Sequence, residues 1–191
     1  MKIKKIFYAL QIMICVVLIS SCEKENQNLS VARPNAKAAF KIGESHGGGI
    51  VFYVDESGQH GLVTSTSNQS TSMRWFNGSF VETTATGIKT GTGSTNTEAI
   101  IKSQGLGVYA ASICDKLELN GYNDWFLPSK DELNLLYMQK AAGVIGDFEN
   151  DFYWSSTENS NNGAWSQSFT NGANSSANKD GAYDVRAIRA F

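Results

Sequence analysis

Two short motifs near the start of the chain contain the residue types of a hydrolase. Residues 43–47 read Gly-Glu-Ser-His-Gly, the G-x-S-x-G pattern of a serine nucleophile, and residues 46–49 read His-Gly-Gly-Gly, an oxyanion pattern. A nucleophile elbow needs a strand before the serine, a helix after it, and then an acid and a histidine. Here a polar segment precedes Ser45, a β-rich run follows, and His60 is the only later histidine. We therefore expect no esterase site, and we interpret the glycines as the flexible start of a strand.

Cysteine and metal chemistry have equally little support. Cys114 lies in a run whose apolar residues recur at helical spacing, which predicts a small buried side chain rather than a reactive thiol. Two histidines and no H-E-x-x-H motif argue against zinc. Calcium stays open, because oxygen ligands such as Asp124, Glu158 and Asp184 could converge without a linear motif. Acidic side chains that are scattered along a sequence in this way usually lie in solvent, so we expect neither a metal nor another cofactor.

The length and the charge of the chain limit the number of domains and the remaining classes of function. The 191 residues hold 16 Lys and Arg against 18 Asp and Glu, a formal net charge of −2, and 41% of the residues are apolar. That is enough apolar content for one ordinary domain. The near-neutral balance argues against nucleic acid as a partner, because phosphates require a basic surface.

The first residues have the order of an export signal. Three lysines precede an apolar run from Ile6 to Ile19, and Ser20, Ser21 and Cys22 follow. This order predicts a signal peptide over residues 1–21. The run Ile-Ser-Ser-Cys resembles the lipobox of bacterial lipoproteins, whose cysteine is acylated; the alternative is an ordinary signal with a chance cysteine. We expect an outer-membrane lipoprotein of the bacterial cell envelope, facing the periplasm or the surface.

Removal of the signal would change the charge of the mature chain. Its three lysines leave with it, so 13 basic and 18 acidic residues remain, a net charge of −5. An acidic surface is repelled by anionic lipids, so the membrane should be a partner only through the acyl chains on Cys22. Residues 22–39 lack an apolar period and contain Pro34, which predicts a flexible tether. A single domain is expected over residues 40–191.

The pattern along this domain predicts a hairpin, then helices, then short strands. Residues 49–54 and 60–65 are β-rich and flank a turn at residues 55–58. Capping boxes at Thr95–Glu98 and Ser129–Glu132 predict two helix starts, and the helix that carries Cys114 lies between them. Further strands are expected at 152–157 and 164–169, with one closing strand at 183–190. The order is that of an α+β domain with a small, twisted, mainly antiparallel sheet and two or three flanking helices.

A segment rich in amides is the candidate binding region. Residues 159–179 contain six Asn, five Ser and one Trp, and their only charged side chain is Lys179. Amides and hydroxyls both donate and accept hydrogen bonds, which suits a hydroxyl-rich polymer or a protein. The competing interpretation is a solvated loop. The candidate ligand-binding residues are Asn159, Asn161, Asn162, Trp165, Gln167, Asn171, Asn174 and Asn178.

Three blocks carry a resemblance to a known family. They read GYNDWFLPSKDELNLLY at 121–137, YWSSTE at 153–158 and VRAIRAF at 185–191. In this order they resemble the C-terminal domain of the Legionella collagen-like protein (the Lcl C-terminal domain), over roughly residues 42–191. The resemblance implies a C-type-lectin-like fold, in which two helices flank a twisted antiparallel sheet and a long loop region binds. The matching residues, for which it implies mainly structural roles, are Trp125, Leu127, Pro128, Trp154, Ser155, Ser156, Glu158 and Arg186.

The resemblance also implies a class of function. The binding activities of the Lcl C-terminal domain family imply a non-catalytic adhesion module. Its partner would be a glycan, another surface polymer or a protein outside the cell. The sequence lacks the E-P-N and Q-P-D triplets of calcium-dependent lectins, so a calcium-bridged sugar is not expected. Glu158 is expected to pair with Arg186 or Arg189. Two alternatives remain open: an envelope enzyme that uses dispersed carboxylates, such as a glycosidase, and a structural lipoprotein without a soluble ligand.

Overall fold

The computed structural model describes residues 38–191, as nine strands and three helices. The predicted signal peptide, Cys22 and most of the predicted tether lie outside the described residues. The helices are α1 Gly93–Gln104, α2 Ala110–Asp115 and α3 Lys130–Ala141. The strands are β1 Ser45–His46, β2 Gly49–Val54, β3 Gly61–Thr64, β4 Ser70–Met73, β5 Phe152–Ser160, β6 Gly163–Ser168, β7 Asn174–Asn178, β8 Tyr183–Val185 and β9 Ile188–Ala190. Within the described range, each helix is too short or too polar to span a membrane.

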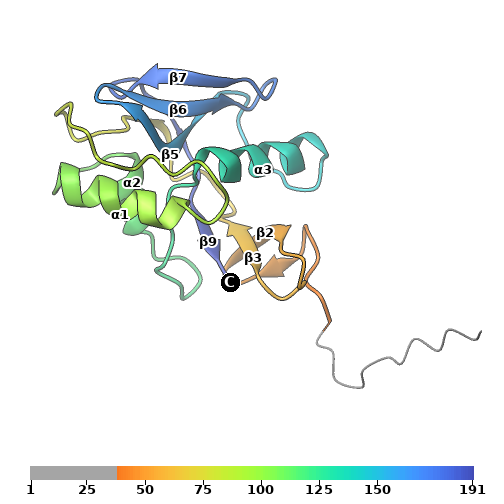
Figure 1. The fold of residues 1–191 in the computed structure, drawn as a ribbon. Helices are drawn as coiled ribbons and strands as arrows, with labels where there is room; N and C mark the ends of the chain where they lie inside the picture. Colours follow the sequence, from red (N-terminus) through yellow and green to blue (C-terminus); the bar gives the residue numbers. More distant parts are fainter. Residues whose placement is uncertain (1–37) are drawn as a thin grey trace, which may run out of the picture. The chain divides into compact units, whose positions relative to one another are not determined.

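The strands form two sheets, which Figure 1 shows on either side of α3. The smaller sheet has the order β1-β2-β3-β9, and all its pairings are antiparallel. The larger sheet has the order β4-β8-β5-β6-β7, and its β5–β8 pairing is parallel. The α+β class with mainly antiparallel pairing is therefore confirmed. The strands form two sheets instead of one, and the larger sheet is mixed.

The opening hairpin forms where the sequence predicts it. Strands β2 and β3 pair from Ile50 with Thr64 to Val54 with Gly61. The turn between them is closed by the Asp55 N–H, which donates to the His60 carbonyl at 2.8 Å. Val51 and Phe52 are fully buried, as β-branched and aromatic residues in a covered strand should be.

The predicted single closing strand is wrong, because the chain changes sheets within it. Strand β8 pairs with β4 and β5, whereas β9 pairs with β3 in the other sheet. Between them, the Arg186 guanidinium donates to the Ser65 carbonyl at 2.8 Å, and the Ala187 carbonyl accepts from the Ser65 N–H at 3.0 Å. These side-chain and backbone bonds hold residues 186–187 in the passage from one sheet to the other.

Helix α1 starts earlier than its predicted capping box, so that prediction is wrong. The N-cap is Thr92, and Thr95 and Glu98 lie inside the helix. Packing requires a glycine at the first helical position, because a side chain on Gly93 would meet the Glu132 carboxylate at 2.2 Å. By contrast, the Ser129–Glu132 box of α3 is confirmed: each side chain accepts a hydrogen bond from the other residue's N–H.

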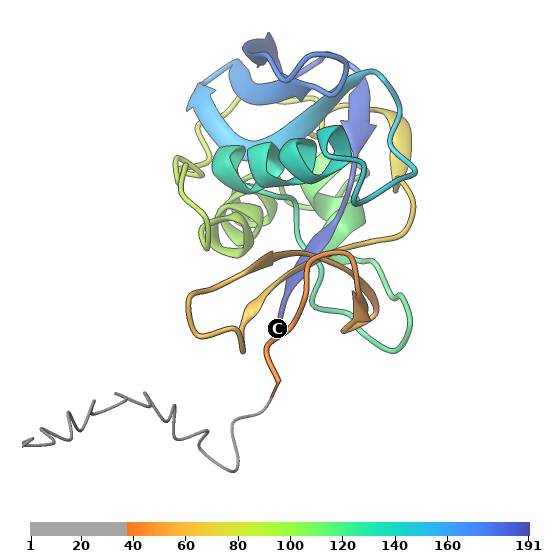
Figure 2. The ribbon, with the colours of Figure 1, turned by 90° about the vertical axis from the view of Figure 1, so that its right-hand side faces the viewer.

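Two apolar clusters make up the core. The first includes Trp75, Tyr109, Cys114, Trp125, Leu127 and Trp154, next to α1 and α2. The second packs α3 against both sheets and includes Phe52, Leu133, Leu136, Tyr153, Phe169 and Ile188. Figure 2 shows the same layering, with α3 between the β5–β6 strands and the β2–β3 hairpin. Cys114 is buried as predicted, and burial raises the pKa of its thiol far above the ordinary value.

A polar network surrounds Arg186 beside the second cluster. The Asn68 amide donates to the Tyr153 hydroxyl at 2.9 Å and to the Asp184 carboxylate at 3.1 Å, and its oxygen accepts from Arg186 at 2.9 Å. The guanidinium also lies 3.9 Å from the centroid of the Phe148 ring. Every side chain of the network thus has a partner, as buried polar groups require.

Burial raises the pKa of Tyr153 to about 12, from an ordinary value of 10.0. The folded domain therefore holds this proton more tightly than the unfolded chain does. The resulting stabilisation is fully present below pH 10 and is lost as the pH rises through about 12. In alkaline titrations followed by phenolate absorbance, we expect the difference between the wild type and Tyr153→Phe to have its midpoint near pH 12. A midpoint near 10 would contradict this placement of the hydroxyl.

Candidate functional site

An irregular segment at residues 82–86 lies beside the end of strand β5. Thr83 and Ala85 are fully buried, whereas Glu82, Thr84 and Thr86 are exposed, so the side chains alternate as in a strand. The Thr83 N–H donates to both carboxylate oxygens of Glu158, at 3.1 and 2.8 Å. The Glu158 N–H in turn donates to the Ala85 carbonyl at 2.8 Å. These bonds attach the segment to β5.

The exposed side chains of the segment face a hollow, which we call the Thr84 groove. It has a volume of about 350 Å³ and is lined by Glu82, Thr84, Thr86, Glu158, Asn159 and Ser160. The lining combines hydroxyls, an amide and carboxylates from two stretches of chain that are far apart in the sequence. Hydroxyl and amide groups supply donors and acceptors, so this surface can bind a hydroxylated ligand from both walls.

Thr84 has an uncommon backbone conformation. Its φ is +62°, a left-handed value that is a genuine outlier for a β-branched residue. The local turn is closed by the Thr86 N–H, which donates to the Thr84 carbonyl at 2.8 Å. Such strain costs about 1–3 kcal/mol and persists only where the surroundings impose it, often at binding sites. Here the bonds of Thr83 and Ala85 to Glu158 impose it.

A buried ion pair holds the two walls of the groove together. The Lys179 ammonium contacts the Glu158 carboxylate and donates to the carbonyls of Val81 at 2.9 Å and Asn161 at 2.7 Å. It also lies 4.7 Å from the centroid of the Trp75 ring, and the Lys179 side chain is fully buried. The expected pairing of Glu158 with Arg186 or Arg189 is therefore wrong.

The other residues of the YWSSTE block at 153–158 form hydrogen bonds to other parts of the scaffold. The Ser155 hydroxyl donates to the Trp165 carbonyl at 2.8 Å, and the Ser155 carbonyl accepts from the Trp75 indole at 2.8 Å. The Ser156 N–H donates to the Pro128 carbonyl at 2.7 Å, and the Trp154 indole donates to the Met73 carbonyl at 2.8 Å. Trp125 and Leu127 are buried in the first core cluster.

The amide-rich segment, residues 159–179, forms the end of β5 and the strands β6 and β7 rather than one loop. Six of its candidate residues are exposed, namely Asn159, Asn161, Asn162, Asn171, Asn174 and Asn178. The structure brings Asn159 into the Thr84 groove, where its amide also donates to the Ser176 hydroxyl. The other five lie along the strand ends and turns and do not line the groove.

The two other candidates of this segment lie against helix α3. Gln167 is fully buried, and its amide nitrogen donates to Asn134 at 2.8 Å and to the Gly172 carbonyl at 3.0 Å. It therefore joins β6 to the helix and is not part of an exposed surface. Trp165 is half-buried, and the Lys130 ammonium lies 3.8 Å from its ring centroid. That cation occupies ring surface on which a sugar would otherwise stack.

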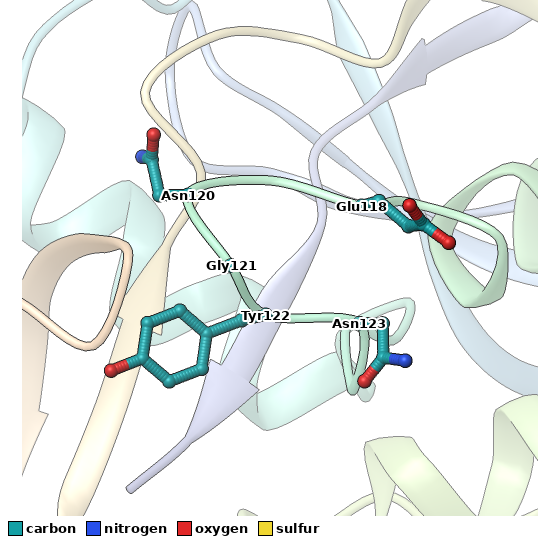
Figure 3. Close-up of a pocket in the computed structure, with 5 residues that line it drawn as sticks. All are labelled: Glu118, Asn120, Gly121, Tyr122 and Asn123. Atoms are coloured by element: carbon teal, nitrogen blue, oxygen red, sulfur yellow. The ribbon is translucent and has the colours of Figure 1, made fainter.

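A second hollow, of about 430 Å³, lies at the loop between α2 and α3. The loop is a tight hairpin in which Leu119 pairs with Tyr122, and Asn120 and Gly121 have φ values of +52° and +83°. Figure 3 shows the side chains of Glu118, Asn120 and Tyr122 pointing in different directions. A ligand site needs polar groups that converge, so the Thr84 groove is the better candidate.

The catalytic motifs of the sequence do not assemble into a site. His46 packs its ring against Phe40 and Phe191, with centroid distances of 4.2 and 4.6 Å. Ser45 belongs to the two-residue strand β1, and His60 lies at the exposed end of the hairpin turn. The three possible calcium ligands also stay apart: Asp124 contacts Arg189, Glu158 contacts Lys179, and Asp184 accepts from Asn68.

Comparison with known proteins identifies the family to which the chain belongs. The sequence profile of the Lcl C-terminal domain matches residues 63–189, from within β3 to within β9. The chain belongs to the Lcl C-terminal domain family. The resemblance carried by the three sequence blocks is thus confirmed, whereas the C-type-lectin-like fold stays a prediction.

One solved structure shows a partial likeness to this Lcl C-terminal domain protein. It is a fimbrial protein from Bacteroides ovatus ATCC 8483, with a TM-score of 0.46 and 18% identity over 68% of this chain. The aligned part covers 35% of that protein, so the chain spans about a third of its length. A search of curated proteins found no match.

Sequence reasoning missed four residues that line the Thr84 groove, namely Glu82, Thr84, Thr86 and Ser160. Thr84 and Thr86 fall in residues 83–97, which are rich in Gly and Thr and read as a loop, and Glu82 lies just before them. The alternation of exposed and buried side chains has no counterpart in the sequence, because the buried Thr83 is the same residue type as the exposed Thr84 and Thr86. The strain at Thr84 has no sequence signal, since threonine does not favour a positive φ.

Proposed function

We propose that this domain is a non-catalytic binding module whose Thr84 groove takes a hydroxyl-rich ligand, such as a glycan strand. The module is displayed on the bacterial cell envelope through an acylated Cys22. The observation that carries the proposal is a set of exposed hydroxyl and amide groups that line one hollow. They come from residues 82–86 and from the end of β5, which hydrogen bonds hold together. The volume of about 350 Å³ lies within the range of small-molecule sites.

The contacts of Glu158 favour binding over hydrolysis. A glycosidase needs two carboxyl groups on either side of the scissile bond, one of which gives up a proton. Glu82 and Glu158 are the carboxyl groups of the groove, but the oxygens of Glu158 accept from the Thr83 N–H and contact the Lys179 ammonium. Release of reducing ends from a bound glycan, lost in Glu82→Gln, would support the enzyme alternative instead.

Substitutions in the Thr84 groove should weaken ligand capture without unfolding the domain. Thr86→Val removes a hydroxyl at constant shape, and Asn159→Ala removes an exposed amide. The loss of a hydrogen bond costs about 0.5–1.5 kcal/mol, so each change should lower affinity several-fold, up to about tenfold. The measurement is binding of the purified chain to glycan and matrix-protein arrays, followed by titration of the best ligand.

The matched control is Asn171→Ala, which removes an exposed amide of the same segment outside the groove. It should bind like the wild type. Equal binding by all three variants would place the site elsewhere. A wild-type chain that binds nothing on either array would support the structural lipoprotein.

Lipid attachment is a separate expectation with its own test. With two or more acyl chains on Cys22 the protein should be retained at a membrane, because one chain gives only marginal binding. Cells fed a fatty-acid analogue should label the wild type, and Cys22→Ala should be unlabelled and released from membranes. Cys22→Ala that stays labelled and membrane-bound would refute acylation at this position.

A further inference from the structure

The edges of the two sheets differ in how they are protected against pairing with another strand. Strand β1 has only two residues, and the outer side of β9 is paired with Phe126. Strand β4 contains a register shift between Ser70 and Met73. Short strands, coverage and bulges are the usual protections of sheet edges.

Strand β7 has none of these protections within the described domain. It pairs with β6 over its whole length, from Asn174 opposite Gln167 to Asn178 opposite Gly163, without a register shift. Figure 1 and Figure 2 both show it as the outer strand of its sheet, with no element beyond it. The outer side of β7 is therefore open to another strand, although the outward Asn178 carbonyl also accepts from the Gly181 N–H at 2.9 Å.

The direction of the backbone groups follows from two hydrogen bonds at the ends of this ladder. The Lys179 N–H donates to the Asn162 carbonyl, and the Ser168 N–H donates to the Ala173 carbonyl, each at 2.9 Å. In an antiparallel ladder alternate residues turn their N–H and C=O groups toward the partner strand. Positions 173, 175, 177 and 179 therefore face β6. Asn174, Ser176 and Asn178 turn their backbone groups away from it.

The side chains of β7 suit pairing with a copy of the same strand. The sequence Asn-Ser-Ser-Ala-Asn contains neither charge nor proline. When two copies lie antiparallel about Ser176, each Ser176 faces the other, and Asn174 faces Asn178. The outward backbone groups are symmetric about the same residue. No like charges oppose each other in this register, so it carries no electrostatic penalty.

We propose that two copies of the chain associate through β7, pairing antiparallel about a two-fold axis at Ser176. The two five-stranded sheets then become one continuous sheet, and the contact is the same on both copies. The contact uses the edge of β7 and not the walls of the Thr84 groove, so it goes beyond the proposed binding function. A five-residue strand gives a small interface, which predicts weak and reversible dimers.

Proline at Ser176 tests the pairing directly. Because the Ser176 N–H points outward, Ser176→Pro removes a donor of the dimer and leaves the β6–β7 ladder intact. Sedimentation of the purified full chain over a concentration series should show dimers for the wild type and for the control Ser176→Ala. The dimer dissociation constant of Ser176→Pro should rise at least tenfold. A monomeric wild type, or equal dimerisation by Ser176→Pro, would overturn the proposal.

Cysteine cross-linking tests the register and does not depend on the proline variant folding. In the proposed pair the two Ser176 Cα atoms lie about 5.5 Å apart, which suits a disulfide. Ser176→Cys should therefore form covalent dimers on mild oxidation. The control Ser175→Cys should not, because Ser175 faces position 177 of the other copy. Equal cross-linking by both variants, or none by Ser176→Cys, would refute this register.

Discussion

A full chain that lacks residues 183–191 is expected to lose its cooperative unfolding transition. The deletion removes β8, which lies between β4 and β5, and β9, which pairs with β3. Val185, Ala187 and Ile188 are fully buried, and each large apolar side chain contributes about 1.5–3 kcal/mol when buried. Together with the lost ladders of both sheets, this is a large part of a typical stability of about 5–15 kcal/mol.

The control for this deletion is removal of Phe191 alone. Its ring is half-buried against Phe40 and His46, and both sheets keep their strands without it. This shorter chain should melt at a lower temperature but still cooperatively. Thermal unfolding followed by near-ultraviolet circular dichroism makes the comparison. A cooperative melt of the chain without residues 183–191 would show that β8 and β9 are dispensable.

Replacing Lys179 by methionine is expected to lower the free energy of unfolding by about 3–5 kcal/mol. The reason is the carboxylate that remains: Glu158 is 5% exposed and would lose its cation. The walls of the Thr84 groove would also lose one of their links, because Lys179 joins Val81 to Asn161. Urea denaturation measures the change.

Two further variants show whether the ion pair is the cause. The double variant Lys179→Met/Glu158→Gln should regain part of the loss, because it removes the unpaired charge and keeps an acceptor for the Thr83 N–H. Lys130→Met removes an ammonium that contacts the half-buried Trp165, and should change the stability by no more than about 1 kcal/mol. If Lys179→Met behaves like Lys130→Met, the buried pair does not stabilise the fold.

The features that could be predicted from the sequence are those whose signals lie within a few residues. The Ser129–Glu132 capping box fixes the start of α3 because both partners belong to one turn. The opening hairpin follows from two β-rich runs and a turn between them. The three blocks of family resemblance also lie mostly within the matched residues 63–189.

The features that could not be predicted depend on partners distant in the sequence. The closing segment reads as one strand, and the change of sheet at Arg186 depends on Ser65 and Asn68, which lie far upstream. The first position of helix α1 has to be a glycine because Glu132 and Phe126 leave no room for a side chain there. Alternation and capping patterns contain no information about such contacts.

The candidate site was predicted in part. The amide-rich segment supplies Asn159, and the neighbouring Ser160 also lines the Thr84 groove. The opposite wall depends on how residues 82–86 attach to Glu158, a contact across 75 residues of sequence. The amide of Gln167 is buried because α3 places Asn134 against it, which the composition of the segment does not reveal.

The most direct test of the proposed binding site is a map of where a captured ligand touches the domain. Backbone amide NMR spectra would be recorded while the best array ligand is titrated into the chain. We predict that the largest shifts fall on residues 82–86 and 158–160, the two walls of the Thr84 groove, and leave residues 118–123 unchanged. Shifts centred on residues 118–123, with the groove unaffected, would contradict the account.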